Sequence, residues 1–423
     1  MKRTWITCGL ITAILGMLVH PVMGQDEVPI PESQDDQPNE FVDALTGGKV
    51  SLNLRVRLET VNQDGKDDSE AVTARIRLGY ETKSFHGLSF RIDVEDVRSP
   101  WSSEYNAAGL NNQPNKAVVA DPEDTALDQL YVKYVWEEIN STFIVGRQRI
   151  KLDDDRFIGN VGWRQIEQTY DSARWNVTPI EDLDVVYSYL WKVKRIFGPD
   201  ADRDWDSDSH IINVAYKGME SCKIVGFAYL LDLDNDDVAP NGDFFSSDTY
   251  GMRVSGKHVF NEEYSLAYIG SYAHQEDAGD NPTNYDADYY KIEAALTKKE
   301  LGTFGAGYEV LGSDDSLMAF QTPLATLHAF NGWADAFLTT PTAGLEDFYI
   351  FAKTTLPWDI KGAVYAHWFE AEDGSAEWGE EIDLVLSKKI NSNWSILTKF
   401  AEFNGKNGFA DTTKFWFQTE FTF

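Results

Sequence analysis

The chain ends on the stretch KFWFQTEFTF, residues 414–423, whose side chains alternate between two faces. A period of two residues is that of a β-strand rather than a helix. One face carries Phe415, Phe417, Thr419, Phe421 and Phe423, and the other carries Lys414, Trp416, Gln418, Glu420 and Thr422. The stretch therefore predicts a final strand that presents a phenylalanine edge and stops on an aromatic residue.

The same alternation recurs from residue 49 to the end of the chain. Strands of this kind are expected at 49–59, 72–81, 88–95, 127–137, 141–150, 166–177, 182–194, 209–218, 221–232, 247–260, 263–274, 286–299, 302–312, 345–356, 359–370, 379–389, 393–403 and 412–423. That makes about eighteen strands, an even number within the range of outer-membrane barrels.

The connections between these strands alternate in length. Every second strand ends in a tight turn, as at 85–87, 138–140 and 261–262. The other connections are mostly longer and cover 60–69, 99–126, 151–165, 195–208, 233–246, 275–285, 313–344, 371–378 and 404–411. In an antiparallel meander, all long loops then lie on one rim, and all tight turns and both termini lie on the other. This asymmetry predicts an all-β fold, a transmembrane antiparallel β-barrel with short periplasmic turns and long extracellular loops.

A soluble β-sandwich is the alternative fold, because its strands alternate as well. The lengths of its connections need not follow strand parity, however, and its outward face is polar. Trp358, Trp378 and Trp394 lie near the ends of the expected strands, where the aromatic girdles of a membrane protein are found. These features favour the barrel.

Three segments are expected along the chain. Residues 1–24 have the order of a secretory signal peptide, with Lys2 and Arg3 before a short apolar run and Gly24 at the cleavage site. Residues 25–48 are acidic, contain prolines and lack basic residues, which predicts a disordered periplasmic lead-in. The barrel domain is expected over residues 49–423.

Charge and cysteine content exclude some classes of protein. The formal net charge is −32, so we expect no nucleic-acid partner, which would need clustered lysine and arginine. Cys222 is the one cysteine outside the signal segment, so no intramolecular disulfide can form. Asp200, Asp202 and Asp204 begin an acidic run spaced like calcium ligands, but the glycine and distal glutamate of an EF-hand loop are absent. No metal site is predicted.

Basic residues collect on the polar parity of several strands, which would face the lumen. They are Arg55, Arg57, Arg75, Arg77, Arg91, Arg147, Arg149, Lys192 and Lys194. Guanidinium groups along a narrow aqueous channel would stabilise passing carboxylates, sulfates or phosphates. The alternative is that they pair with Glu59, Glu81, Asp93 and Glu95 and brace the wall, and both can hold at once.

Two passages carry more than periodicity: GRQRIKLDDDRFIGNVGWRQIEQTYDSAR, residues 146–174, and TPLATLHAFNGWADAFLTTPTAGLEDFY, residues 322–349. They resemble the alginate-export family of outer-membrane barrels. The matching residues are Gly146, Arg147, Gln148, Arg156, Phe157, Gly159, Trp163, Arg164, Gln165, Leu327, His328, Phe330, Gly332, Trp333, Ala334, Asp335 and Phe337. The resemblance extends from residue 49 to 423 and is specific at these two motifs.

The resemblance implies an eighteen-stranded monomeric barrel whose arginine-lined pore passes a polyanionic polysaccharide. Arg147, Arg164 and Arg174 are then expected to face the pathway. Uptake of small anions or oligosaccharides stays open, because the family domain also occurs in many proteins with no evident link to alginate secretion.

The segment 313–344 is expected to form more than a simple loop. Leu327, Phe330, Trp333 and Phe337 have helical spacing, which predicts a short amphipathic helix over or in the mouth. His328, Trp333 and Asp335 would belong to this constriction. The equal alternative is a packing unit that only closes the rim, in which His328 and Asp335 pair structurally.

The expected function is an outer-membrane channel for anionic solutes, including a polyanionic polysaccharide or oligosaccharide, with no cofactor. We expect it in the outer membrane of a Gram-negative bacterium, in contact with lipid and lipopolysaccharide, and inserted by assembly machinery that reads Phe423. A general diffusion porin without anion preference is one alternative. A barrel hydrolase is another, since Ser316 and His328 share a loop, but no G-x-S-x-G motif occurs and no catalytic residue is predicted.

Overall fold

The computed structural model describes residues 39–235 and 242–423. The predicted signal peptide, most of the predicted lead-in and part of the 233–246 loop lie outside these residues. Within the described ranges, no helix is both long and apolar enough to cross a membrane.

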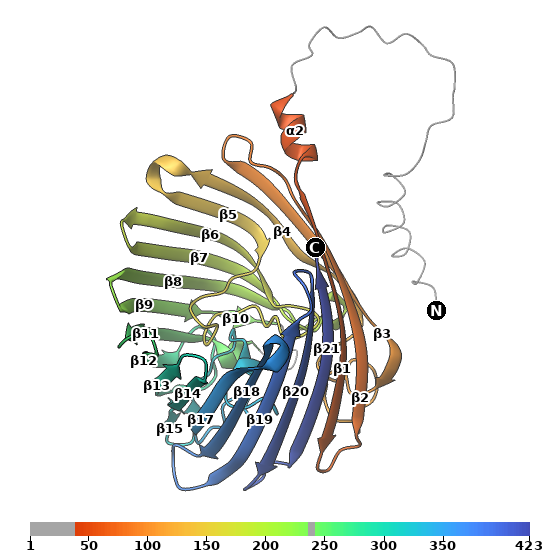
Figure 1. Ribbon diagram of the computed structural model, residues 1–423, viewed down its shortest axis with the longest axis vertical. Helices are drawn as coiled ribbons and strands as arrows, with labels where there is room; N and C mark the ends of the chain where they lie inside the picture. The colour runs from red at the N-terminus through yellow and green to blue at the C-terminus, as the bar shows by residue number, and fades with distance from the viewer. Residues whose placement is uncertain (1–38, 236–241) are drawn as a thin grey trace. The chain divides into compact units, whose positions relative to one another are not determined.

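The described residues form one antiparallel sheet of eighteen long strands (Figure 1). These are β1 (Lys49–Gln63), β2 (Ser69–Glu81), β3 (Leu88–Glu104), β4 (Asp124–Trp136), β5 (Ser141–Gln148), β6 (Thr169–Ile180), β7 (Leu183–Lys194), β8 (Trp205–Met219), β9 (Cys222–Leu231), β11 (Ser247–Val259), β12 (Tyr264–Asp277), β13 (Asp286–Lys298), β14 (Gly302–Leu311), β17 (Leu345–Leu356), β18 (Ile360–Glu370), β19 (Glu377–Lys389), β20 (Trp394–Gly405) and β21 (Thr412–Thr422). The predicted strand count is confirmed.

Several short elements accompany the long strands. The two-residue strand β10 (Leu233–Asp234) follows β9 after a break at Asp232 and, like β9, pairs with β8. In another loop, β15 (Ser313–Asp314) pairs with β16 (Met318–Ala319). Among the described residues, five 3-10 turns lie in the connections: η1 (Glu137–Ile139), η2 (Pro199–Ala201), η3 (Asp243–Phe245), η4 (Leu327–Ala329) and η5 (Pro357–Asp359).

The sheet closes on itself because the last strand pairs with the first. The register of β1 and β21 runs from Asn53 opposite Thr422 to Gln63 opposite Thr412. Beyond it, the Phe423 amide donates to the Leu52 carbonyl at 2.9 Å. A sheet with an open edge could not lie in hydrocarbon, so this seam confirms the predicted antiparallel barrel.

The two faces of β21 separate as the alternation predicts. The outward side chains Phe415 and Phe417 are 38% and 45% exposed, whereas the inward Lys414 and Trp416 are 5% and 0% exposed. An apolar outer wall and a polar inner wall are the arrangement of a barrel in lipid.

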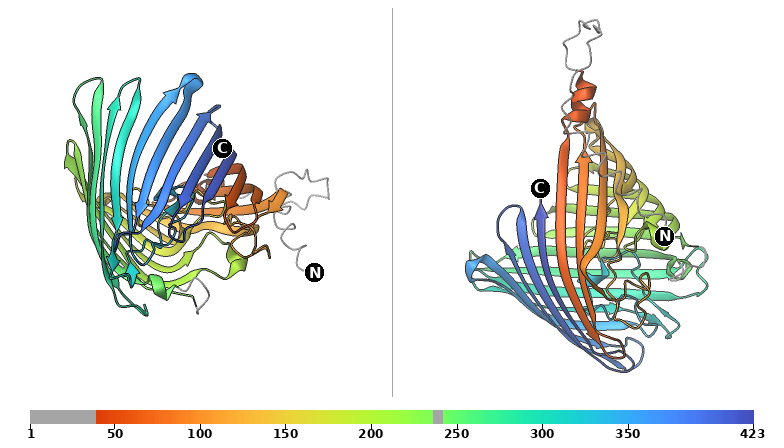
Figure 2. Two further views of the ribbon diagram at one scale, coloured as in Figure 1. Left: turned by 90° about the horizontal axis from the view of Figure 1, so that it is seen from below. Right: turned by 90° about the vertical axis from the view of Figure 1, so that its right-hand side faces the viewer.

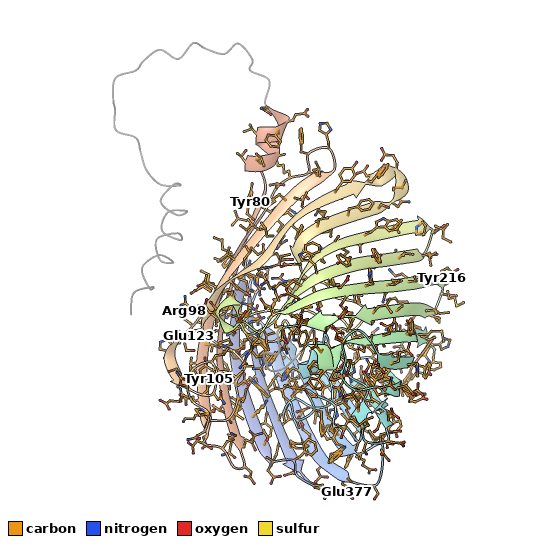
Figure 3. All side chains as sticks on the ribbon, turned by 180° about the vertical axis from the view of Figure 1, so that it is seen from behind. Tyr80, Arg98, Tyr105, Glu123, Tyr216 and Glu377 are labelled. Carbon is orange, nitrogen blue, oxygen red and sulfur yellow. The ribbon has the colours of Figure 1, made fainter. Side chains whose placement is uncertain are left out.

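Turns and loops segregate to opposite rims of the barrel. The turn rim holds the eight tight turns and the two ends of the barrel domain, and the loop rim holds the nine other connections. Figure 3 labels Tyr80 and Tyr216 toward the turn rim and Glu377 at the loop rim. Several boundaries differ from the prediction by a few residues. For example, β1 and β2 continue further, so their connection covers 64–68 instead of 60–69.

The last part of the predicted disordered lead-in is ordered. Residues Glu40–Thr46 form the helix α2 beside the turn that leaves β2. The Tyr80 hydroxyl donates to the Leu45 carbonyl, the Lys83 amide donates to the Ala44 carbonyl at 3.0 Å, and the Lys83 ammonium pairs with Asp43 at 3.1 Å. These contacts with the barrel stabilise a segment whose composition alone predicts disorder.

Two loops of the loop rim fold into the lumen, and Figure 2 shows connecting segments within the ring of strands. They are the 149–168 loop and the 312–344 loop, joined by hydrogen bonds such as Gly159 amide to Leu324 carbonyl at 2.8 Å. Ile150, Ile158, Phe320 and Leu324 pack into the main apolar cluster with inward residues of the strands. The loops are therefore part of the interior.

The prediction of a short amphipathic helix in the 312–344 loop is wrong. The only helical element in the described backbone there is the three-residue turn η4. Asn331, Gly332 and Asp335 have φ values of 54°, 83° and 61°, in the left-handed region that an α-helix cannot include. The apolar side chains that suggested a helical stripe instead pack from an irregular backbone.

Candidate functional site

The inward arginines of β1 and β2 hold the 149–168 loop against the wall. Nη1 of Arg55 donates to the carbonyls of Gly162 and Trp163 at 3.1 and 3.4 Å. Nη2 of Arg57 donates to the Trp163 carbonyl at 2.5 Å, and Nη1 of Arg75 donates to the Gln165 carbonyl at 3.0 Å. Loop carbonyls that would otherwise be buried without partners are thus satisfied by strand arginines.

A buried ionic network lies beside this contact. Arg77 is 2.6 Å from both Glu95 and Glu167 and 3.2 Å from Asp128. Arg149 also pairs with Glu167, at 2.6 Å. Burial alone would raise the pKa of Glu167, but Arg77, Arg149 and Arg75 outweigh it and lower this pKa to about 2. The loop carboxylate therefore stays ionised and binds the loop to the wall.

The other basic residues predicted to line the pore are also mostly paired. Arg91 pairs with Glu81 and Asp93, Arg147 with Asp171, Lys192 with Asp206, and Lys194 with Asp204. Arg174 differs, since its Nε donates to Asn176 and no described carboxylate lies within 4.0 Å of it. These contacts are those of the bracing alternative, in which the arginines stabilise the wall.

His328 lies at the point where the two inward loops meet. Its ring is parallel to Trp163, with centroids 4.5 Å apart and planes 10° apart, and it meets the edge of Trp416 at 5.6 Å. Nδ1 is 2.7 Å from Oδ1 of Asp335, and Nε2 is 2.8 Å from Nζ of Lys399. We call Trp163, His328, Asp335, Lys399 and Trp416 the constriction cluster.

Burial and the neighbouring positive charges keep the His328 ring neutral. Burial lowers the pKa of His328 well below its ordinary value, and Lys399 and Arg164 lower it further, against the opposite effect of Asp335. Asp335 also accepts from Lys414 at 2.7 Å and from Arg164 at 3.1 Å. Despite its burial, these neighbours lower the pKa of Asp335 well below its usual range. His328 and Asp335 therefore pair as the packing alternative describes.

Lys399 has an unusual environment for an inward lysine. Its Nζ lies 3.6 Å from the ring centroid of Trp333, 4.3 Å from that of Trp163 and 5.4 Å from that of Trp416. No described carboxylate lies within 4.0 Å of it. The ammonium is therefore held by aromatic faces and the His328 imidazole rather than by an ion pair.

Three cavities lie along the lumen. The outer cavity, of about 400 Å³, is lined by Arg164, Arg195, Lys414 and Asp335 among others. The inner cavity, of about 460 Å³, includes Lys291, Lys353 and Lys399 together with the carboxylates of Asp154, Glu293, Glu309 and Asp347. His328 lines both the outer and the inner cavity. The rim cavity, of about 400 Å³, lies toward the turn rim and includes Lys298, Lys299, Lys353 and Lys361.

The lysines of the inner and rim cavities were not predicted from the sequence as pore-lining residues. In the described structure, Lys353 and Lys361 have no carboxylate within 4.0 Å. Both share the parity of Tyr349 and Phe351 in β17 and its partner β18, so the alternation could have placed them inside. The basic residues recognised from the sequence near the start of the barrel lie on other strands than β17 and β18.

The residues suggested for a hydrolase do not form a catalytic pair. The Ser316 hydroxyl donates to Asp373 at 2.7 Å, whereas both ring nitrogens of His328 bond to Asp335 and Lys399. Among the residues that the structure describes, no three His, Cys, Asp or Glu side chains are grouped so that they could hold a metal ion.

A closed barrel of eighteen strands, with an apolar outer wall and a polar lumen narrowed by inward loops, defines an outer-membrane channel of the porin class. The chain belongs to the alginate-export family, because the family model described as "Alginate export" matches residues 52–283.

Solved structures share this fold at low sequence identity. OccK9 (OpdG) of Pseudomonas aeruginosa aligns with a TM-score of 0.70 at 14% identity, covering 89% of this chain and 98% of that one. OccAB3 of Acinetobacter baumannii aligns with a TM-score of 0.69 at 12% identity, covering 89% and 99%. A comparison with curated protein sequences gives no match.

Proposed function

We propose that this channel passes small anionic solutes along the lysines of the inner and rim cavities. The observation that carries the proposal is that Lys353 and Lys361 are exposed, line these cavities and form no ion pair with any described carboxylate. An ammonium that is not already paired is available to a passing carboxylate, sulfate or phosphate. Arg55, Arg57 and Arg75, which are also expected to line the pore, position the 149–168 loop.

The outer cavity supports the same preference. Its charged lining consists of Arg164, Arg195 and Lys414 against the single carboxylate of Asp335. A cavity of about 400 Å³ has the size of a small-molecule site rather than of a polymer channel. We therefore propose a solute of the size of a single sugar acid or a short oligosaccharide.

A polyanionic polysaccharide is the second candidate solute, and the family match favours it. Its passage would require the 312–344 loop to leave the lumen, because His328 separates the outer and inner cavities. Added alginate oligomers would then block the ionic current only in variants that release this loop.

The proposal places the protein in the outer membrane of a Gram-negative bacterium, as a monomer among phospholipid and lipopolysaccharide. It is inserted by assembly machinery that reads the C-terminal Phe423, and it works without a cofactor or catalytic residue.

Single-channel recording in asymmetric potassium chloride tests anion preference. The wild-type reversal potential is expected to favour chloride, and Lys353→Met with Lys361→Met is expected to move it toward zero. Lys388→Met is the matched control, because this lysine lies on the outward parity of β19. A wild-type reversal potential that favours potassium would overturn the proposal.

A further inference from the structure

The inner cavity has an aromatic wall that the anion path does not use. Tyr349 and Phe351 of β17 and Tyr365 and His367 of β18 occupy neighbouring inward positions. The centroids of contacting rings are 5.3 to 6.3 Å apart, and their planes differ by 21 to 34°. We call these four nearly parallel rings the ring platform.

Two rings of the platform occupy space left by glycines of β14. Phe351 is opposite Gly305 in the register, and Tyr349 is opposite Gly307. A Cβ at Gly305 would lie 2.2 Å from Cζ of Phe351, and one at Gly307 would lie 2.2 Å from Cζ of Tyr349. The rings therefore lean along the wall over the glycines, where any side chain would displace them.

The ammonium of Lys353 lies over the faces of two rings of the platform. Nζ of Lys353 lies 4.5 Å from the ring centroid of Phe351 and 5.4 Å from that of Tyr365. The ring of Trp333 in the 312–344 loop contacts Tyr365 at 5.4 Å between centroids. Because Lys353 is exposed and has no described ion pair, its head group is free to move aside for a ligand.

Polar groups surround the platform within the same cavity. Glu293 accepts a hydrogen bond from the Tyr349 hydroxyl at 2.5 Å, and Glu309, Asn331 and Asp347 also line the space. A purely aromatic ligand would desolvate these polar groups without offering them hydrogen bonds, which is unfavourable. An open-chain acid would leave the ring faces uncovered.

A sugar ring matches both properties of the cavity. The axial C–H bonds of a pyranose give it apolar faces that lie on aromatic rings, and its rim of hydroxyls donates to carboxylates and accepts from ammonium groups. The cavity of about 460 Å³ is within the usual range of small-ligand sites.

We propose that the ring platform is a binding subsite for a saccharide ring. The subsite deepens the proposed function and rests on it only in that the solute enters along the same path. It makes the channel selective for cyclic solutes over open-chain ones of equal size and charge.

Block of the ionic current by added solute tests the subsite in planar bilayers. Glucose and sorbitol are the first probes, because they are uncharged and differ mainly in the presence of a ring. Glucuronate and gluconate are the second pair, because they carry equal charge. In the wild type, the cyclic member of each pair is expected to reach half-maximal block at the lower concentration.

Phe351→Leu is expected to raise the half-blocking concentration of glucose about two- to tenfold, the range of one aromatic contact, and to leave that of sorbitol unchanged. Gly305→Ala, which displaces the same ring without removing it, is expected to act in the same direction. Phe348→Leu on the outward face of β17 is the control for the first variant. Gly270→Ala, whose Cβ would meet nothing within 4 Å, is the control for the second.

Equal block by glucose and sorbitol in the wild type would overturn the subsite, as would variants indistinguishable from their controls. The reversal potential of the same channels separates this failure from that of the proposed function. Cation selectivity with a retained preference for glucose would refute only the anion path. Anion selectivity without a ring preference would refute only the subsite.

Discussion

Lys399 donates a hydrogen bond from Nζ to Nε2 of His328 at a distance of 2.8 Å. Because the ionised Asp335 carboxylate can only accept, the proton of the neutral ring lies on Nδ1, where it is donated to Asp335 at 2.7 Å, and Nε2 is left to accept from Lys399. One strand lysine and one loop carboxylate thus fix both the tautomer and the orientation of the imidazole that separates the two cavities.

Acidification is expected to loosen this arrangement. The pKa of His328 is lowered in the folded barrel mainly by burial, so below its ordinary value of 6.5 the unfolded chain binds a proton that the folded chain does not. Stability is therefore complete above pH 6.5 and is lost as pH falls toward the lowered pKa. The melting midpoint of the barrel in detergent, followed across this range, measures the effect.

His328→Gln isolates the titration, because an amide can still donate to Asp335 and accept from Lys399. This variant is expected to lose the pH dependence below 6.5 while remaining folded. His258→Gln, at an exposed position of β11, is the control and keeps the wild-type profile. An unchanged profile in His328→Gln would contradict the assignment.

Glu167→Gln is expected to destabilise the barrel by about 3 to 5 kcal/mol, the range for breaking a buried ion pair on one side. The variant removes one of the two carboxylates that Arg77 and Arg149 share, the other being that of Asp128. Since the pKa of Glu167 is lowered from 4.5 to about 2, its contribution is complete above about pH 4.5 and is lost as pH falls toward 2.

Urea unfolding at pH 7 and pH 3 checks this sign. The difference between wild type and Glu167→Gln is expected to shrink at the lower pH, where the wild-type carboxylate loses part of its advantage. Glu138→Gln, on an exposed turn, is the control. A difference that grows on acidification would be inconsistent with the ionised buried pair.

Arg156→Lys is expected to loosen both inward loops at once. The guanidinium of Arg156 reaches Glu309 at 2.8 Å, Thr322 at 3.0 Å and Asn331 at 3.2 Å, so one side chain joins the 149–168 loop, the 312–344 loop and β14. Lysine keeps the charge but cannot form this fork. We expect a loss of about 1 to 3 kcal/mol and a noisier, larger open-channel current.

Arg98→Lys is the matched control for that change, because Arg98 is exposed and makes its ion pair with Asp96 at the surface. Current traces of the two variants in the same lipid make the comparison. Quiet traces of wild-type amplitude from Arg156→Lys would show that the loops do not depend on this residue.

Phe423→Ala is expected to separate folding from insertion. The seam uses the backbone amide and carbonyl of Phe423, bonded to Leu52 at 2.9 and 3.2 Å, while its ring is 63% exposed. The variant should therefore refold in detergent to a heat-modifiable barrel but accumulate poorly in the outer membrane of cells. Phe417→Ala, on the same face, is the control and should accumulate normally.

Much of the architecture could be predicted because the strands of a membrane barrel follow two simple sequence patterns, the alternation of apolar and polar residues and the lengths of the connections. The alternation around Phe415, Phe417 and Trp416 gave the face of each residue, and loop lengths gave the rims. Partners across the lumen follow no such local rule. Arg77 meets Glu167 from a loop 90 positions away, a contact that parity alone does not specify.

The 312–344 loop shows a second limit of the sequence. The spacing of Leu327, Phe330 and Trp333 fits a helix, but Asn331 and Gly332 adopt left-handed backbone conformations that end any helix there. Tertiary contacts decide this backbone: Asn331 donates to Glu309 at 2.9 Å, and the Ala334 amide donates to Glu381 at 2.7 Å. The periodicity of a short segment contains no information about partners so distant in sequence.

The pairing of β1 with β21 also dictates an order of events. Asn53 and Thr422 bond across a sequence separation of 369 residues, so the first strand has no partner on one side until the last one arrives. Contacts of such separation form late and slowly. The barrel can therefore close only after β21 has reached β1, and until then the free edge of β1 needs another hydrogen-bonding partner.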